Sequence, residues 1–215
     1  MNLIFDIGNV ICEWNPEALV ARLFDSAGQG REALKSIINH PDWISLDKGL
    51  IEVDQAVSNA AARSFLDAEA ILRIYQETPP SLVPIEPMVA AIRDLKSRGY
   101  PLFTLSNMQK HSWNWLFPRY NFWSLFDGIV VSYEIHMVKP DREIFEYTCG
   151  RYELDPAATI FLDDIQENID TARDCGMQTI LVSNIQQALN DLYFKLGIDI
   201  RDKGHWVRGT KTLDY

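Results

Sequence analysis

Five short apolar runs constrain the fold of this 215-residue chain more than any other feature. Each has the length of one strand, and most are separated by segments with helical periodicity. Continuous apolar runs are typical of strands that are covered on both faces of a parallel sheet. The sequence therefore predicts an α/β fold with a Rossmann-like parallel sheet flanked by helices. The runs are Leu3–Phe5, Pro101–Leu105, Gly128–Val131, Thr159–Leu162 and Thr179–Val182.

The long interval between the first two runs has little strand character. Its helical segments are Pro16–Phe24, Arg31–Ile38, Val53–Arg63 and Ala68–Glu77. A polar and aromatic loop with His40, Trp43 and Asp47 lies among them, and Pro79 and Pro80 indicate the return to the core. We therefore predict a core domain of residues 1–14 and 85–215 and a small helical cap domain of residues 15–84.

Composition and charge exclude several classes of partner. A formal net charge of −10 argues against nucleic acids and anionic membranes, which bind basic surfaces. Cys12, Cys149 and Cys175 lack metal-ligand or redox spacing, so we expect free thiols in a reducing compartment. No leader pattern or membrane-length apolar run is visible, and we expect a cytoplasmic protein with a small-molecule partner. Whether it forms a homodimer stays open.

Polar residues follow four of the predicted strands. Because the carboxyl ends of parallel strands face one crevice, we expect these residues to converge there. Taken singly, Ser106-Asn107 also fits a helix cap, and Lys139 fits a solvated lysine. Adjacent carboxylates at a buried strand end repel each other and need a cation or hydrogen-bond donors to stay ionised. The acidic pair therefore favours a metal site over the alternative of a solvated turn in which Asp164 caps a helix. The residues are Asp6, Ser106, Asn107, Lys139, Asp163 and Asp164.

These motifs, taken in order, resemble those of the haloacid dehalogenase superfamily of hydrolases. The similarity covers roughly Asn2 to Val182 and is closest to the branch with a helical cap. That branch includes bacterial sugar-phosphate phosphatases and the phosphatase domain of soluble epoxide hydrolases. The motifs are Asp6-Ile7-Gly8-Asn9-Val10, Leu105-Ser106-Asn107, Lys139-Pro140 with Ile144-Phe145, and Asp163-Asp164 with Asn168.

The resemblance implies a magnesium-dependent phosphatase that acts on a small phosphoester, with a sugar phosphate favoured. Asp6 would be the nucleophile that forms an aspartyl-phosphate. Ser106, Asn107 and Lys139 would bind the phosphoryl group, and Ser106 and Lys139 would also assist catalysis. Mg²⁺ would be held by Asp6, the Gly8 carbonyl and Asp164, with Asp163 acting through a metal-bound water or from outside the ligand shell. Asn168 would orient this acidic loop.

Gly8 departs from the family pattern. Most phosphatases of the family carry there an Asp that protonates the leaving alcohol, and losing such a group costs about 10²–10⁴-fold in rate. Proton transfer through Glu13, through Asn9 and a water, or through a cap residue such as His40 is one explanation. An acidic leaving group, as in an anomeric sugar phosphate, is the second, and a slow enzyme is the third.

Two other functions stay open. A 2-haloacid dehalogenase would use the same nucleophile without a metal, but the intact Asp163-Asp164 pair favours a metal and a phosphate. A non-catalytic binding or regulatory module would be consistent with Gly8 and with the carboxyl-terminal extension, residues 183–215. That extension contains a helical segment, Ile185–Leu196, and His205, to which no role is assigned.

Overall fold

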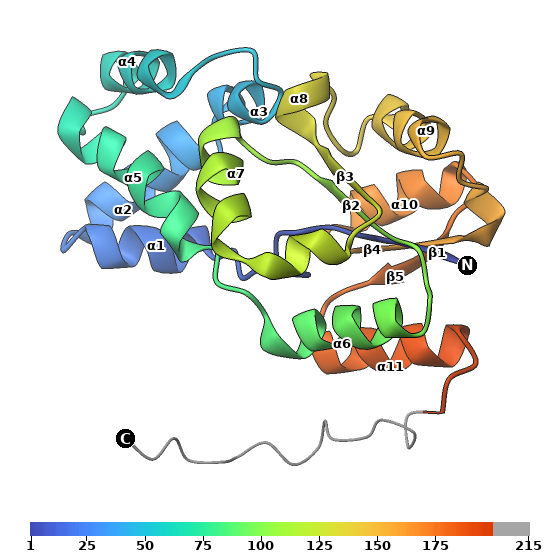
Figure 1. Ribbon diagram of the computed structural model, residues 1–215. Helices are drawn as coiled ribbons and strands as arrows, with labels where there is room; N and C mark the ends of the chain where they lie inside the picture. Colours follow the sequence, from blue (N-terminus) through green and yellow to red (C-terminus); the bar gives the residue numbers. More distant parts are fainter. Residues whose placement is uncertain (200–215) are drawn as a thin grey trace, which may run out of the picture.

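The computed structural model describes residues 1–199, and a five-stranded parallel sheet lies at its centre (Figure 1). The strand order is β3-β2-β1-β4-β5, and each neighbouring pair is parallel. Every apolar run of the sequence became a strand, with bounds that differ by at most one residue, which confirms the predicted fold class. The strands are β1 (Asn2–Phe5), β2 (Leu102–Ser106), β3 (Gly128–Val131), β4 (Thr159–Asp163) and β5 (Gln178–Leu181).

Helices cover both faces of this sheet. In Figure 1, α6 (Glu86–Ser97) and α11 (Ile185–Lys195) lie on one face, and α9 (Arg142–Arg151) and α10 (Gln166–Asp174) lie on the other. Successive side chains of a strand point to opposite faces. Accordingly, Leu3 and Phe5 belong to the apolar core under α6 and α11, whereas Ile4 belongs to the core under α9 and α10. Both faces of β1 are therefore buried, as the unbroken apolar run predicts.

Two shorter helices follow β2 and β3. They are α7 (Lys110–Leu116) and α8 (Ser132–Ile135). The aromatic segment around α7 continues through two short 3₁₀ turns, Phe117–Arg119 and Asn121–Leu125. Trp113, Phe122 and Trp123 are buried in the core, where the Trp113 and Trp123 rings meet edge to face at 5.1 Å. Most of this aromatic density therefore serves packing.

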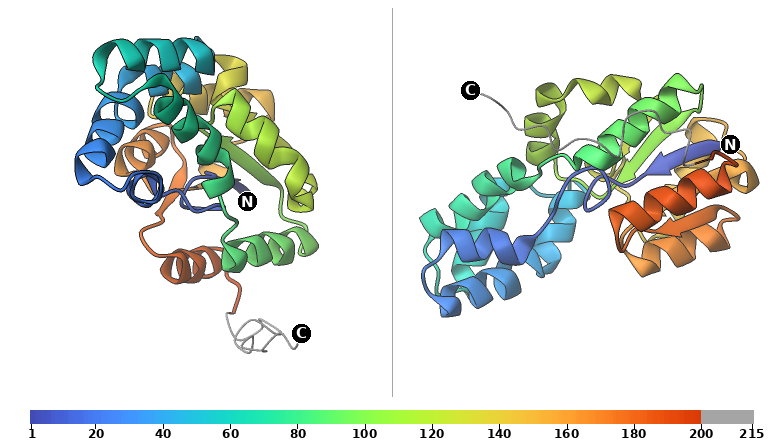
Figure 2. Two further views of the ribbon diagram at one scale, coloured as in Figure 1. Left: turned by 90° about the vertical axis from the view of Figure 1, so that its left-hand side faces the viewer. Right: turned by 90° about the horizontal axis from the view of Figure 1, so that it is seen from below.

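Between β1 and α6 the chain forms a group of helices with an apolar core of its own. We call this group, residues 16–81, the helical insert. Ile37, Ile71 and Ile74 are fully buried within it. Figures 1 and 2 show the insert beside the end of the sheet toward which β1 runs. Its elements are α1 (Pro16–Leu23), α2 (Ala27–Ala33), a π-helical turn (Leu34–Ile38), α3 (Pro41–Asp47), α4 (Val53–Arg63) and α5 (Ala68–Ser81).

The segment with His40, Trp43 and Asp47 is a helix, α3, so the expectation of a loop was wrong. Pro41 occupies its first position, where a missing N–H costs nothing. The Nδ1 atom of His40 accepts a hydrogen bond from the Asp42 N–H at 3.2 Å and so caps the helix start. With seven residues, α3 is too short to display a clear helical period.

Helix α5 also runs further than expected, through Pro79 and Pro80 to Ser81. A proline inside a helix removes the hydrogen bond to the carbonyl four residues earlier, which for Pro79 is that of Tyr75. The His111 Nε2 atom of α7 lies 3.2 Å from that carbonyl oxygen and provides a replacement partner. A contact from another element therefore allows the helix to continue.

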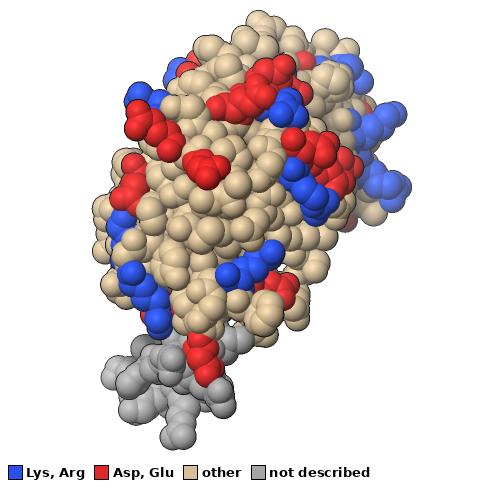
Figure 3. Space-filling model, turned by 90° about the vertical axis from the view of Figure 1, so that its right-hand side faces the viewer, with Lys and Arg blue, Asp and Glu red and all other residues tan. Residues whose placement is uncertain are grey.

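Acidic and basic side chains are interspersed on the face of the molecule shown in Figure 3. Several of them pair along helices that cover the sheet, such as Arg142 with Glu146 at 2.7 Å and Arg173 with Asp170 at 2.9 Å. Within residues 1–199, no helix has the length and apolar character needed to cross a membrane. The His205 region of the extension lies outside the described residues.

Candidate active site

Three carboxylates and one lysine meet at the carboxyl ends of the strands. Asp6 follows β1, Asp163 ends β4, Asp164 comes next, and Lys139 lies in the loop between α8 and α9. One oxygen from each carboxylate lies within 4.8 Å of the other two. The Lys139 Nζ atom is 2.9 Å from Asp6 Oδ1 and 2.5 Å from Asp163 Oδ2. The sequence prediction that these strand ends converge is thus met by the geometry.

Asp6 is held by one of its two oxygens. Its Oδ1 atom accepts a hydrogen bond from the Ile7 N–H at 2.7 Å and contacts Lys139, whereas no described residue donates to Oδ2. Burial, opposed by Lys139 and reinforced by the charge of Asp163, raises the pKa of Asp6 to about 7 when no cation is bound. Because Oδ1 is held in place, the orientation of Oδ2 is fixed as well, and the lone pairs of Oδ2 remain available.

Asp163 organises the acidic loop. It is fully buried, and its Oδ1 atom accepts hydrogen bonds from the Ile165 N–H at 2.8 Å and the Asn168 amide at 2.9 Å. Burial lowers the pKa of Lys139, but the charges of Asp6 and Asp163 outweigh it and raise that pKa overall. Lys139 is therefore a permanent cation, and the alternative of a solvated lysine does not hold.

Asp164 is positioned by Asn9. The Asn9 amide donates to Asp164 Oδ2 at 2.9 Å, and its Oδ1 accepts from the Trp14 N–H at 2.9 Å. Asn9 has φ of +52°, a left-handed conformation that Asn adopts more readily than most residues. Burial raises the pKa of Asp164. The turn after β1 thus links Asp6 to the acidic loop and to Trp14, and the side-chain amide of Asn9 is committed to these structural contacts.

Ser106 and Asn107 lie at the end of β2, beside Lys139. Asn107 exchanges two hydrogen bonds with the Lys139 backbone, donating to its carbonyl at 2.9 Å and accepting from its N–H at 2.8 Å. Helix α7 begins three residues later, at Lys110, so these residues do not form its cap. Helix α9 begins at Arg142, so Lys139 and Pro140 also lie in a loop before a helix. Asn107 therefore fixes the loop that carries Lys139.

The charges of this cluster fit a divalent cation. Three carboxylates face a single lysine, which leaves two negative charges uncompensated in a largely buried site. Oxygen ligands of this kind are those that Mg²⁺ prefers. The Gly8 carbonyl belongs to the same turn, and Gly8 lines the cavity that contains Asp6 and Asp164. The residues present are thus a suitable donor set for Mg²⁺.

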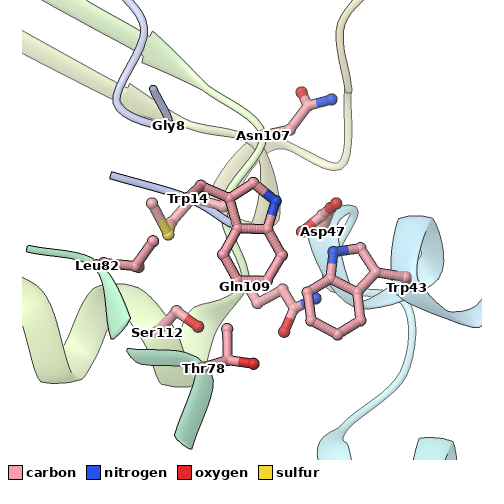
Figure 4. Close-up of a pocket in the computed structure, with 10 residues that line it drawn as sticks. Gly8, Trp14, Trp43, Asp47, Thr78, Leu82, Asn107, Gln109 and Ser112 are labelled. Carbon is pink, nitrogen blue, oxygen red and sulfur yellow. The ribbon is translucent and has the colours of Figure 1, made fainter. Parts of the chain in front are cut away.

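Two adjoining cavities open beside the cluster. The first is lined by Asp6, Lys139 and Asp164 together with Ser106 and Asn168. The second is enclosed by Thr78, Leu82, Met108, Gln109 and Ser112 (Figure 4). Residues shared by both cavities mark the passage between them, and these are Gly8, Trp14, Trp43, Asp47 and Asn107.

Two buried polar residues that line the second cavity were not among the predicted site residues. Asp47 ends α3, and Gln109 precedes α7. Glu13 and His40, both considered as proton donors, line neither cavity, because Glu13 is exposed and His40 caps α3. An acid in an otherwise aromatic and polar segment was the signal available in the sequence, but only the fold places Asp47 in the same two cavities as Gly8.

Comparison with known proteins identifies the family. The haloacid dehalogenase-like hydrolase family matches residues 4–182, which is most of the chain. The chain belongs to this family of hydrolases. The resemblance drawn from the motifs is therefore confirmed, together with the expectation of a hydrolase.

Relatives of this haloacid dehalogenase-like hydrolase include phosphatases. It is 31% identical over 174 residues to the sesquiterpene phosphatase astK of Aspergillus oryzae, covering 81% of this chain and 85% of the relative. It is 32% identical to the glyceraldehyde 3-phosphate phosphatase of Methanothermobacter thermautotrophicus over 61% of this chain and 54% of that protein. The chain spans only about a third of some longer curated relatives.

Solved structures of the family share the fold. A family enzyme from Bacteroides thetaiotaomicron, in complex with magnesium and inorganic phosphate, superposes with a TM-score of 0.64 at 22% identity. The match covers 84% of this chain and 92% of that one. At this identity the comparison supports the architecture of the sheet and its flanking helices.

Proposed function

We propose that the protein is a magnesium-dependent phosphatase that hydrolyses a small phosphomonoester through an aspartyl-phosphate on Asp6. The observation that carries this proposal is the Asp6 carboxylate, whose Oδ1 is fixed by Lys139 at 2.9 Å while Oδ2 stays free. A carboxylate fixed in this way suits in-line attack on phosphorus, because phosphoryl transfer depends mainly on positioning and on nearby cations.

The binding of a cation is part of the proposal. Asp6, Asp164 and the Gly8 carbonyl would hold Mg²⁺, while Asp163, whose oxygens already accept from three protein donors, would act from outside the ligand shell. Bound Mg²⁺ would neutralise phosphoryl charge. The phosphatase names of two relatives and the magnesium complex of the Bacteroides enzyme support this assignment.

The phosphoryl group would lie between Asp6 and the end of β2. Ser106 lines this cavity together with Lys139 and Asn107, and is itself buried. We assign the phosphoryl oxygens to the Ser106 hydroxyl, the Asn107 backbone N–H and the Lys139 ammonium. The Asn107 side chain is excluded from this role because it already bonds the Lys139 backbone.

The second cavity supports two classes of organic group on the ester. A sugar phosphate remains one, since indole rings such as those of Trp14 and Trp43 stack on the apolar faces of sugars. An apolar alcohol phosphate is the other, favoured by Leu82 and Met108 in the same wall and by the name of the sesquiterpene phosphatase. Phosphate release from both classes, at matched concentrations, distinguishes them.

Release of inorganic phosphate with Mg²⁺ and with a chelator tests the proposal. We expect turnover only with Mg²⁺, and loss of turnover in Asp6→Asn, whereas the surface variant Asp170→Asn keeps full activity because Asp170 contacts only Gln166 and Arg173 on α10. Trapping of a beryllofluoride adduct on Asp6 would support the covalent step. No phosphate release and no adduct would favour a binding module.

The dehalogenase alternative makes the opposite prediction. Halide release from a 2-haloacid would need Asp6 but no metal. If a chelator left halide release intact while phosphate release was undetectable, the dehalogenase would replace the phosphatase as the conclusion.

A further inference from the structure

We propose that Asp47 of the helical insert is the general acid that takes the place of the group missing at Gly8, with Gln109 as the residue that positions it. This inference rests on the proposed function. It assigns the proton donor to a side chain 39 positions away from Gly8 in the sequence, on a different element of the fold.

The location of Asp47 is the first argument. Asp47 and Gly8 line both cavities, so both stand at the passage between the phosphoryl site and the pocket for the organic group. The bond that breaks in a phosphomonoester joins these two parts of the substrate. A proton donor must lie within reach of the bridging oxygen, and Asp47 lines the space where that oxygen would lie.

The surroundings of Asp47 are the second argument. The residue is only 8% exposed, and within residues 1–199 no basic side chain pairs with it. Burial raises the pKa of Asp47 to about 8, which Gln109 lowers and the charge of Asp6 raises. A carboxyl group in such a place keeps its proton at neutral pH, as a general acid must.

Other charged groups near α3 are already paired. Lys48 pairs with Asp141 at 3.3 Å, and Arg63 of α4 pairs with Asp42 at 2.8 Å. From α8, the His136 Nδ1 atom lies 2.7 Å from the Lys48 carbonyl oxygen. Asp6 is therefore the charged group that acts on Asp47 across the cavity.

Gln109 supplies the third argument. Its side chain is 3% exposed, and within residues 1–199 neither its Nε2 nor its Oε1 atom makes a hydrogen bond of good geometry, although the amide lies near enough to Asp47 to lower the pKa of that carboxyl. Buried amides without well-formed hydrogen bonds are uncommon, because an unmade hydrogen bond in a buried place is unfavourable. Figure 4 shows Gln109 in the same pocket as Asp47, with the Trp14 and Trp43 rings beside them. An amide left open toward a cavity is suited to bind a substrate atom or to orient Asp47.

The chemical step balances without another reagent. As Asp6 Oδ2 forms a bond to phosphorus, the bond from phosphorus to the ester oxygen breaks and its electron pair stays on that oxygen. Asp47 donates its carboxyl proton to this oxygen, so the products are a neutral alcohol and an Asp47 carboxylate. In the second half, that carboxylate accepts a proton from water as the water oxygen attacks phosphorus, which releases phosphate from Asp6 and restores both residues.

The proposal is tested with two Mg²⁺-loaded assays that differ in the leaving group. For an alkyl phosphate, whose leaving alkoxide needs a proton, we expect Asp47→Asn to lower kcat/KM about 10²–10⁴-fold. For a nitrophenyl phosphate, whose phenolate leaves without one, we expect kcat/KM to fall less than about tenfold, because kcat/KM does not include the hydrolysis of the aspartyl-phosphate that both esters share. Retained nitrophenyl phosphatase activity also shows that the variant is folded. The exposed insert variant Asp54→Asn serves as the matched control.

A rescue variant strengthens the test. A Cβ atom at Gly8 would lie 3.8 Å from the nearest side-chain atom outside its immediate neighbours, Trp14 Cβ, so an Asp can be accommodated there. Gly8→Asp in the Asp47→Asn background should recover at least tenfold on the alkyl ester. Gln109→Leu should move the alkaline limb of the alkyl-phosphatase profile to higher pH, because Gln109 favours the ionised form of Asp47.

Two results would overturn the assignment. Equal losses on both esters, without rescue by Gly8→Asp, would make Asp47 a structural residue while the phosphatase function stands. Absence of phosphate release by the unaltered protein from either ester would instead refute the proposed function itself.

Discussion

Lys139 is the residue on which the charge balance of the site depends. It is buried between Asp6 and Asp163, so its removal would leave two carboxylates without their cation. Removal of one partner of a buried ion pair destabilises the folded state by about 3–5 kcal/mol, because the remaining charge is left unpaired. We expect Lys139→Met to lower the free energy of unfolding in urea by about this amount and to abolish phosphate release.

Lys110→Met is a suitable control for that measurement. Lys110 makes an ion pair with Glu52 at 2.7 Å, but both side chains are largely exposed. Exposed pairs contribute at most about 1 kcal/mol, so a comparable loss in both variants would contradict the account of Lys139 given above.

The raised pKa of Asp47 leads to a second prediction about a single residue. Its pKa is about 8 in the folded protein, against 3.8 for an ordinary Asp such as that of the unfolded chain, so the native state retains a proton that the unfolded state has lost. Stability must then fall as pH rises from about 4 to 8, by up to about 1.4 kcal/mol per pH unit.

The Asp47→Asn variant has no carboxyl proton to lose at this position. Its stability should therefore lack the decrease with pH that Asp47 causes. Urea unfolding of both proteins at several pH values tests the prediction, because other titrating groups cancel in the difference. We expect Asp47→Asn to gain stability relative to the unaltered protein as pH rises to about 8, with no further gain above it. A difference independent of pH would contradict a raised pKa.

At the scale of elements, Ser132 joins the insert to the core. Its buried hydroxyl donates to the Asp47 carbonyl at 2.5 Å and accepts from the Met108 N–H at 2.9 Å. One side chain from the start of α8 therefore fixes the end of α3 against the loop that carries Gln109. The distance between Asp47 and the proposed phosphoryl site therefore depends on the hydrogen bonds of Ser132.

Ser132→Ala should therefore affect both stability and catalysis. It leaves the Met108 N–H without its partner, which costs about 1–3 kcal/mol in a buried place. We expect kcat on an alkyl phosphate to fall more than kcat on a nitrophenyl phosphate. Thermal unfolding and the two assays measure these effects. A uniform loss on both esters would mean that Ser132 serves stability alone.

The sequence predicts an element well when local residues determine it, and poorly when contacts with distant residues do. The strands were predictable because burial on both faces leaves a continuous apolar run in each. Helix α3 was missed because its start depends on the His40 cap and its length is under two full turns of pattern. The extension of α5 past Pro79 depends on His111, 32 residues away, which no local pattern contains.

The same distinction applies to the site. Asp6 follows β1, and Ser106 and Asp163 end β2 and β4, so parallel topology brings these three together. Lys139 comes from the loop between α8 and α9, which the hydrogen bonds of Asn107 hold in place. Asp47 and Gln109 meet through the packing of α3 against α8 and the β2–α7 loop, which is set by tertiary contacts such as that of Ser132. The place of Asp6, the proposed nucleophile, was therefore predictable, whereas the place of Asp47 in the same cavities as Gly8 was not.

For the whole molecule, binding of Mg²⁺ should couple to stability. A ligand that binds only the native state stabilises it by about 2.7 kcal/mol at a hundredfold excess over its Kd. We expect Mg²⁺ to raise the Tm of the protein, and Asp164→Asn to remove most of that increase, because it removes a proposed ligand. Calorimetry with Mg²⁺ and with a chelator measures the effect, and an unchanged Mg²⁺ response in the variant would exclude Asp164 as a ligand.

The position of α3 has a consequence for how such an enzyme diversifies. Under the proposed function, the core carries the nucleophile and the lysine, whereas the insert carries Asp47 together with Trp43 in the wall of the pocket for the organic group. Remodelling of the insert would thus change substrate choice and leaving-group activation in one event, while the phosphate chemistry of the core was inherited unaltered.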